Sequence, residues 1–194
     1  MPITESIDQS TIIYREMTPE DFNAIVILGT QVHGEGYIDN TIIKGWYQKG
    51  IHHNINASFV AYAKDKLVGF RLTFSAQHWD IDSWCTPELW QIPSEQVCYF
   101  KCNTVDENYR GYGIGSQLLN LSISAAKQQG ALAGVSHLWR QSPGNSAVIY
   151  FSKCGGKLIK NHPDRWNELS QQGYQCPVCD LYCHCEAAEM MILF

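Results

Sequence analysis

Residues 105–116 read VDENYRGYGIGS, and this stretch gives the most specific indication of the fold. It follows an apolar, β-branched run that ends at Val105, and a segment with helical spacing begins at Gly115. Glycines alternate at positions 111, 113 and 115, so backbone N–H groups can approach an anion without obstruction by a Cβ atom. The positive end of the following helix points at the same spot. The stretch predicts a turn that holds a pyrophosphate. The alternative is a glycine-rich turn that starts a helix and binds no ligand.

Two familiar nucleotide-binding motifs are missing from this stretch. A dinucleotide-binding fold needs G-x-G-x-x-G after the first strand of a βαβ unit, and an NTPase loop needs Gly-Lys followed by Ser or Thr. Both classes of nucleotide-binding protein are therefore disfavoured.

Apolar periodicity predicts the elements that precede the glycine-rich stretch. Runs of β-branched and aromatic residues predict strands at 11–16, 58–63, 67–74 and 96–105, with the middle two forming a hairpin. Thr18-Pro19-Glu20-Asp21 supplies an N-cap, a first-turn proline and a capping-box carboxylate for a helix that continues to about Leu28. Asp39 or Asn40 caps a second helix that ends near Lys49.

The elements after the stretch alternate between helix and strand. The spacing predicts helices at 115–129 and 145–153 and strands at 134–140, 157–161 and 186–194. Gly155-Gly156 stops the second of these helices. Strands and helices in this order predict a mixed α/β layer fold.

Two segments fit neither period, and we interpret 75–94 and 162–182 as insertions in a single domain spanning residues 1–194. The first insertion contains Trp79, Trp84 and Trp90 among acidic residues. Aromatic faces and carboxylates together attract a cationic amine, so the tryptophans could form a substrate wall. They could equally cap the core beneath a long loop.

The second insertion opens a cluster of thiols. Four cysteines stand within ten residues, at positions 176, 179, 183 and 185. We expect reduced thiols and predict no metal, while a structural zinc ion and a disulfide-forming pair stay open.

Bulk properties narrow the class of protein. A formal net charge of −5 gives no basis for nucleic-acid binding and makes a cation the easier charged guest. The first residues lack the pattern of a signal peptide, and no apolar run reaches the ~18 residues of a membrane span, so we expect a cytoplasmic protein without a membrane partner. The apolar end Met190–Phe194 could be buried in the sheet or at the seam of a homodimer.

The pattern V-x-x-x-x-R-G-x-G-I-G-S-x-L-L resembles the acetyl-CoA loop of the GNAT superfamily of N-acetyltransferases. The segment from Asn145 to Gly156 is similar to the second signature of that superfamily, and the order of elements matches over about 11–161 and 186–194. The resemblance implies a mixed, mostly antiparallel sheet of six to seven strands flanked by about four helices. It implies an acyl-CoA-dependent enzyme that moves the acetyl group of acetyl-CoA onto a primary amine of a small molecule, peptide or protein.

Cofactor-binding residues follow from the same resemblance. Backbone N–H groups of the loop would hold the pyrophosphate of acetyl-CoA, from the residues Arg110, Gly111, Tyr112, Gly113, Ile114, Gly115 and Ser116. The strand that ends at Thr104 and Val105 would splay from the next strand and pair with the pantetheine arm. Asn145 would meet that arm from the other side.

Attack on a thioester needs a neutral amine, and a general base is the usual remedy for a protonated one. The family often places its base on or near the strand before the loop, which makes Glu95 the first candidate. The rivals, which the sequence does not rank, are His33, Glu35, Asp80 and His137.

The departing thiolate gains a proton, and the family commonly uses a tyrosine at a position that Phe151 occupies here. The neighbouring Tyr150 is the candidate acid, although one residue rotates a helical side chain by about 100°. An acyl-CoA sensor without turnover, another acyl donor and a hydroxyl acceptor stay open as alternatives.

Overall fold

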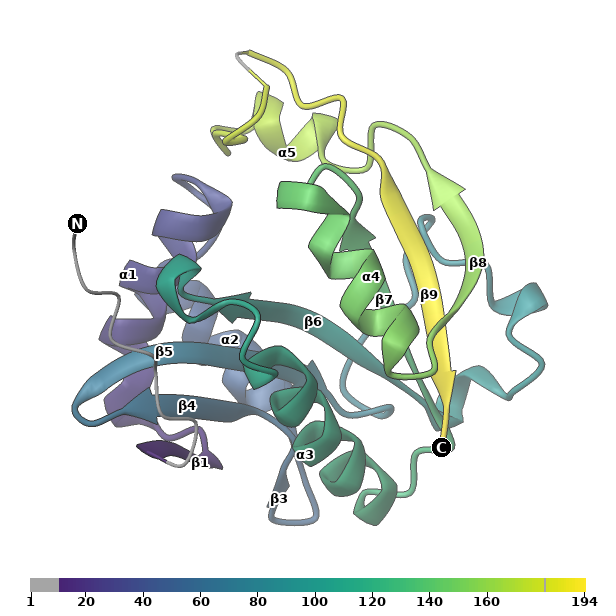
Figure 1. Ribbon diagram of the computed structural model, residues 1–194. Helices are drawn as coiled ribbons and strands as arrows, with labels where there is room; N and C mark the ends of the chain where they lie inside the picture. The colour runs from purple at the N-terminus through teal and green to yellow at the C-terminus, as the bar shows by residue number, and fades with distance from the viewer. Residues whose placement is uncertain (1–10, 180) are drawn as a thin grey trace.

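The computed structural model describes residues 11–179 and 181–194, and its centre is a seven-stranded sheet (Figure 1). The strands lie in the order β1-β4-β5-β6-β7-β9-β8. All neighbouring strands pair antiparallel except β6 and β7, which are parallel. The mixed, mostly antiparallel sheet expected from the sequence is confirmed. The bounds are β1 Ile12–Glu16, β4 Phe59–Ala63, β5 Lys66–Phe74, β6 Val97–Val105, β7 Ala133–Trp139, β8 Lys157–His162 and β9 Ala187–Leu193.

Five α-helices accompany the sheet in the described residues, against about four expected. They are α1 Phe22–His33, α2 Asn40–Lys49, α3 Ile114–Gln128, α4 Ser146–Lys153 and α5 Asn167–Gln171. The fifth is short and lies in the segment predicted to be an insertion. A small hairpin of β2 (Ile51–His52) and β3 (Ile55–Asn56) was also missed, because two-residue strands carry no measurable period. None of the helices in the described part of the chain has the length and apolar character that a bilayer crossing requires.

The prediction that α1 ends near Leu28 is wrong, because the helix continues through Gly29 to His33. Gly29 serves packing here and does not break the helix. A Cβ atom at this position would lie 2.8 Å from the Ile38 side chain and 3.5 Å from Phe70, so the glycine lets the helix approach the sheet closely.

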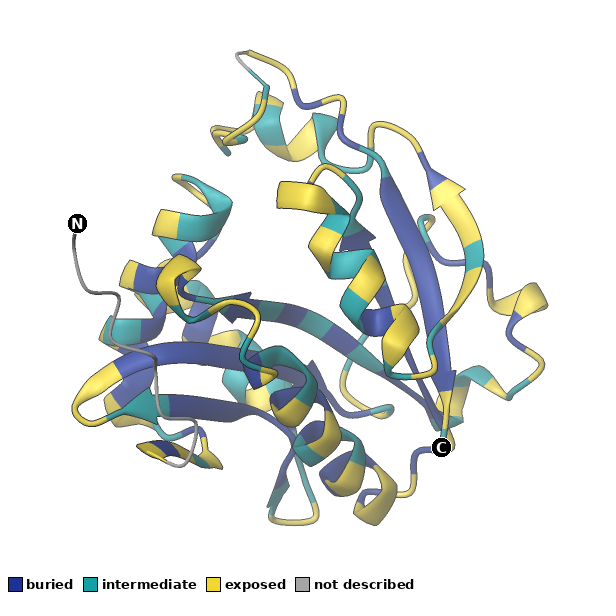
Figure 2. Cartoon of the chain, viewed as in Figure 1, coloured by how far each residue is buried: buried dark blue, intermediate teal, exposed yellow. Residues whose placement is uncertain are grey.

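Helices cover both faces of the sheet, and the central strands are buried between them (Figure 2). α1 and α2 pack on Val60, Phe70 and Leu72 of one face. α3 packs on the opposite face, on Phe59 and Ala61 of β4 and on Val68 of β5. In β4 this division follows the two-residue period of a strand buried on both sides, and in β5 the bulge opposite Ala61 and Tyr62 turns Val68 away from the face of Phe70.

The sheet opens between β6 and β7. Their parallel pairing covers only 97–99 against 133–135, although both strands continue for several residues beyond it. A bulge lies at the point of divergence, since Phe100 and Cys102 have partners in β5 and Lys101 between them has none. The bulge reverses the alternation of β6, so that Cys102 packs against the α1 face and not beside Phe100.

The segment 75–94 is fastened to the sheet through a buried carboxylate. Glu189 of β9 accepts hydrogen bonds from Thr86 N at 3.0 Å, Trp90 Nε1 at 2.7 Å and His162 Nε2 at 2.8 Å. Burial alone would raise the pKa of Glu189, but the bonds from Thr86, His162 and Trp90 outweigh it and lower the pKa. Trp90 is buried and caps the core, and the half-buried Trp79 stacks on Tyr99 with ring centroids 4.8 Å apart.

A Glu189→Gln substitution is expected to lower the free energy of unfolding by about 3 kcal/mol. The amide N–H₂ of glutamine would face N–H groups that now donate hydrogen bonds to the carboxylate, and those groups would lose their acceptor. This corresponds to a fall in Tm of roughly 6–12 °C for a chain of this size. The contribution of the wild-type carboxylate is present above its unfolded pKa of about 4.3 and is lost as the pH falls through the lower folded value. Thermal melts followed by circular dichroism at pH 7 and in acid test this, and equal midpoints at pH 7 would contradict it.

Candidate active site

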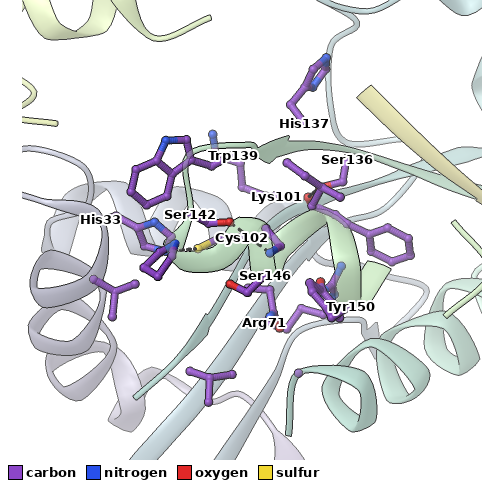
Figure 3. Close-up of a pocket in the computed structure, with 18 of the residues that line it drawn as sticks. His33, Arg71, Lys101, Cys102, Ser136, His137, Trp139, Ser142, Ser146 and Tyr150 are labelled. Atoms are coloured by element: carbon purple, nitrogen blue, oxygen red, sulfur yellow. Dashed lines mark hydrogen bonds between the residues drawn. The ribbon is translucent and has the colours of Figure 1, made fainter. Parts of the chain in front are cut away.

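A cavity of about 380 Å³ lies where β6 and β7 separate (Figure 3). Its walls come from both strands, from the start of α3, from α4 and from α1, and the segment that follows β8 contributes Arg165, Trp166, Tyr174 and Cys183. Residues far apart in the sequence therefore meet at one opening in the sheet.

One end of the cavity is an anion cradle. Gly111 and Gly113 have φ values of 85° and 77°, in the left-handed region, and a Cβ atom on either would meet nothing within 4 Å. Gly113 is the N-cap of α3 and supplies no side-chain cap, so the N–H groups of the first turn have no partner within the helix. Arg110 and Lys153 also line this cavity. Free N–H groups, a helix start and two cations fit a diphosphate.

Most residues predicted to bind the cofactor line the cavity, namely Val105, Arg110, Gly111, Gly113, Ile114, Gly115 and Ser116. Thr104, Tyr112 and Asn145 do not. Thr104 is buried and its Oγ1 lies 2.8 Å from His33 Nε2, while Tyr112 packs against the α3 core cluster. Asn145 holds a left-handed φ of 53° before α4, and its buried Oδ1 has no hydrogen-bond partner.

Tyr150 lines the cavity and Phe151 does not. Phe151 is fully buried and packs edge-on against Phe100, with ring centroids 6.0 Å apart. The Tyr150 hydroxyl accepts a hydrogen bond of 2.8 Å from Nη1 of the buried Arg71, and burial raises the pKa of Tyr150. Because the phenol oxygen accepts this bond, its own O–H is left to donate in another direction.

The structure does not bring Glu95 to the cavity. Glu95 is exposed in a short turn, Ser94–Gln96, at the closed end of the β6–β7 pair. Glu35 is also exposed, and its backbone oxygen accepts from Gln175 N. Among the other candidate bases, His33 and His137 line the cavity.

His137 is held by both ring nitrogens. Nε2 lies 2.6 Å from the Trp84 carbonyl oxygen, which fixes Nε2 as the donor, and Nδ1 then accepts from the Tyr99 hydroxyl at 3.0 Å. Burial lowers the pKa of His137 to about 4. The imidazole is therefore neutral at neutral pH, and it orients Tyr99.

Lys101, at the bulge of β6, is a cavity residue that the sequence analysis missed. Its Nζ lies 4.5 Å from the centroid of the Trp46 ring. Burial lowers the pKa of Lys101 to about 8, so a useful fraction of the amine is neutral near physiological pH. The available signal was the single charged residue in the predicted strand QVCYFKCNTV.

A second hollow of about 220 Å³ adjoins the cavity and shares Tyr99, Lys101, His137 and Arg165 with it. Trp79, Asp80 and Asp82 also line this hollow. Lys49, Lys101 and Arg165 line it as well, and Arg165 pairs with Asp82 at 3.2 Å, so the two carboxylates are balanced by cations. The hollow is a polar approach of mixed charge that a neutral amine can enter.

The fold and the site together define an acyl-CoA-dependent N-acyltransferase. The family model described as Acetyltransferase (GNAT) family matches residues 23–155, and the chain belongs to that family. A comparison with curated protein sequences finds no match.

Solved structures with the same fold include three acetyltransferases. An N-acetyltransferase from Staphylococcus aureus is 18% identical, with a TM-score of 0.67 and coverage of 94% of this chain and 98% of that chain. The ribosomal-protein-alanine N-acetyltransferase of Brucella melitensis is 13% identical, with a TM-score of 0.66 and coverage of 94% and 99%. A putative acetyltransferase, yncA, from Salmonella typhimurium, solved with acetyl-CoA, is 13% identical, with a TM-score of 0.63 and coverage of 94% of both chains.

Proposed function

We propose that this protein moves the acetyl group of acetyl-CoA directly onto a primary amine. The observation that carries the proposal is the cavity between β6 and β7, which has an anion cradle at one end and joins the hollow beside Asp80 and Asp82 at the other. A diphosphate at the cradle and an amine in the hollow would bring the two reactants together near Tyr150 and Lys101. The Salmonella structure, solved with acetyl-CoA, supports this choice of donor.

In the reaction, the amine nitrogen forms a bond to the thioester carbonyl carbon and the C–S bond breaks, its electron pair going to sulfur. The nitrogen loses a proton and the sulfur gains one. For an amine with a pKa near 10.4, only one molecule in about 2,500 is neutral at pH 7. Forming the neutral amine therefore costs roughly 4.6 kcal/mol of free energy. We assign the proton acceptor to neutral Lys101, whose pKa of about 8 suits the task, and the proton donor to Tyr150.

The acceptor is a primary amine of a small molecule, a peptide or a protein. The Brucella enzyme is described as acting on a ribosomal-protein alanine, which supports a protein N-terminus as one member of the class. None of the described residues that line the main cavity is Asp or Glu, whereas Arg71 and Arg165 are cations there. We therefore expect the part of the acceptor that enters the main cavity to be neutral or anionic, with the reacting amine arriving from the hollow.

An amine screen tests the proposed function. The purified protein is incubated with acetyl-CoA and a panel of polyamines, amino acids, aminoglycosides and peptides with free N-termini, and CoA release and product mass are measured. A mass gain of one acetyl group on an amine, with matching CoA release, supports the proposal. Binding of acetyl-CoA without turnover on any amine would favour a sensor, and turnover only with a longer acyl-CoA would correct the donor.

A Tyr150→Phe substitution is expected to lower kcat by up to about 30-fold at pH 7 and by less as the pH approaches about 8.5. A thiol with a pKa near 8.5 can leave unprotonated at pH 7 at a cost of only about 2 kcal/mol. Steady-state rates across this pH range check the prediction, with Tyr14→Phe on the distant β1 as the matched control. A pH-independent loss would show that Tyr150 serves packing and does not supply the proton.

We also propose that the chain is a single domain with insertions at about 75–94 and 162–182. A cytoplasmic location and a homodimer stay predictions from the sequence. Light scattering of the purified protein tests the dimer.

A further inference from the structure

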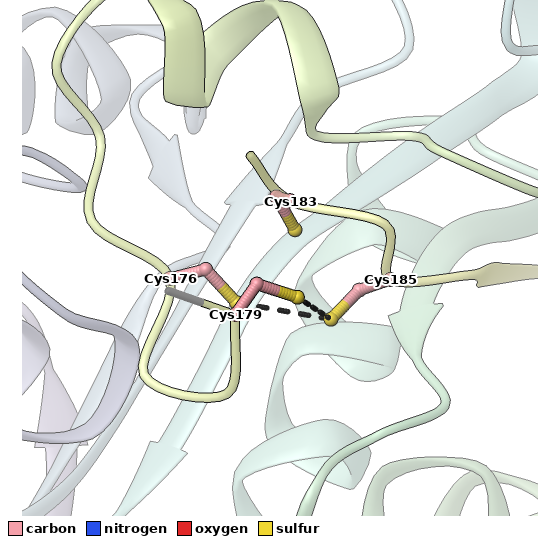
Figure 4. Close-up of side chains that lie close together, drawn as sticks. All are labelled: Cys176, Cys179, Cys183 and Cys185. Atoms are coloured by element: carbon pink, nitrogen blue, oxygen red, sulfur yellow. Dashed lines mark hydrogen bonds between the residues drawn. The ribbon is translucent and has the colours of Figure 1, made fainter. Parts of the chain in front are cut away.

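The four cysteines of the segment that follows α5 converge in space (Figure 4). The sulfur atoms of Cys176, Cys179, Cys183 and Cys185 all lie within 4.8 Å of one another. Cys185 Sγ is 3.7 Å from Cys176 Sγ and 3.8 Å from Cys179 Sγ. Because disulfide sulfurs are about 2.05 Å apart, these contacts are not disulfide bonds.

The spacing fits tetrahedral coordination of one metal ion. A Zn–S bond of about 2.3 Å places the sulfurs of a regular tetrathiolate about 3.8 Å apart. Four thiolates fill the tetrahedron and leave no position for water, which is the arrangement of a structural zinc site and not of a catalytic one. Soft sulfur ligands in this geometry select zinc or iron among the common metals.

The surrounding chain holds the backbone of one ligand, Cys183, from both sides. Cys183 and Cys185 are buried, whereas Cys176 and Cys179 are half-buried. Ser170 of α5 accepts from Cys183 N at 2.9 Å, and Asn167 donates to Cys183 O at 3.2 Å.

A second group of metal-ligating side chains, His137, His162 and Glu189, carries no such inference. The carboxylate of Glu189 is occupied by Thr86, Trp90 and His162, and both nitrogens of His137 have partners. The four sulfurs, in contrast, face one another, with Cys185 Sγ 3.7 Å from Cys176 Sγ and 3.8 Å from Cys179 Sγ.

We propose that Cys176, Cys179, Cys183 and Cys185 bind one Zn²⁺ ion as thiolates. The four thiols lose their protons on binding, and no oxidation or reduction takes place. The ion would hold a segment that forms part of the cavity wall, because the ligand Cys183 and the nearby Tyr174 line the cavity. Gln175 N also bonds Glu35 O at 2.9 Å, so the zinc-held segment is joined to the turn after α1.

Metal analysis of the full-length protein tests the zinc site without reference to catalysis. The protein is purified under reducing conditions without an affinity metal, and its zinc, iron and thiol contents are measured. We expect about one zinc per chain and eight reduced thiols after denaturation. Cys176→Ser and Cys179→Ser should each lower the zinc content at least tenfold, while Cys154→Ser, outside the cluster, should retain it.

A cobalt titration covers the case in which the serine variants fail to fold. Addition of Co²⁺ to wild-type protein stripped of metal should give thiolate-to-cobalt charge-transfer absorption and the visible bands of a tetrahedral ion, saturating at one equivalent and displaced by Zn²⁺. Less than a tenth of an equivalent of zinc in wild type together with no cobalt spectrum would overturn the site. Iron in place of zinc, or fewer than eight reduced thiols with no metal, would also overturn it.

Discussion

A Gly113→Trp variant is expected to lose acetyl transfer, with a KM for acetyl-CoA raised at least 100-fold or beyond measurement. Gly113 has a φ of 77° and stands at the open cradle where α3 begins. An indole there would occupy the space in front of the free N–H groups, and a Trp residue would adopt the left-handed conformation only with strain. Steady-state kinetics at varied acetyl-CoA concentration measures the effect.

Gly130→Trp is the matched control for this experiment. Gly130 follows the other end of α3, has a φ of 96°, and a Cβ atom there would also meet nothing within 4 Å. The backbone strain is therefore similar, but the site is remote from the cradle. If the KM for acetyl-CoA stays at the wild-type value in both variants, or rises equally in both, the cradle at Gly113 is not the site of the pyrophosphate.

A Lys101→Met variant is expected to lower kcat by about 10²- to 10⁴-fold, the usual contribution of a positioned general base. Burial lowers the pKa of Lys101 to about 8, so the rate of the wild-type enzyme should rise with pH and level off above that value. Methionine keeps the length and apolar stem of the side chain. The variant should lose the rise near pH 8 while its KM for acetyl-CoA stays unchanged, which a pH–rate profile measures.

Lys44→Met, on the exposed side of α2, provides the control for the loss of one positive charge. It should retain the wild-type pH profile. A Lys101→Met enzyme with the same pH dependence as wild type would show that another group accepts the proton. His33, which also lines the cavity, would then be the next candidate.

Local sequence signals predicted most of the fold. Asp39 caps α2 by accepting from Thr41 N and Ile42 N, and Thr18 with Asp21 forms the expected capping box. The strand and helix bounds agree within a few residues because caps and periodicity are properties of neighbouring residues. The end of α1 was missed because Gly29 fits the close approach of the helix to Ile38, which is a tertiary effect that local signals do not show.

The candidate site was only partly predictable. Its anion cradle depends on neighbouring residues in the sequence, whereas its catalytic candidates depend on contacts between distant ones. The loop around Gly113 is local in sequence, and its residues lie at the cavity as expected. The catalytic candidates depend on long-range geometry. The bulge at Lys101 arises from the register between β5 and β6, and the choice between Tyr150 and Phe151 depends on which side of α4 meets the opening of the sheet.

The thiol cluster shows the same limit. The spacing of four cysteines within ten residues left a structural zinc site open, but a Cys-x-x-Cys pair alone is weak evidence, and no metal was predicted. The structure adds the distances, because all four sulfurs lie within 4.8 Å of one another.

Calorimetric titration of the wild-type protein with acetyl-CoA measures donor binding at the start of α3, on which acetyl transfer depends. We predict one site per chain with micromolar affinity, about −8 kcal/mol. Folded protein that gives no heat and no displacement of a reporter ligand at millimolar acetyl-CoA would contradict the account.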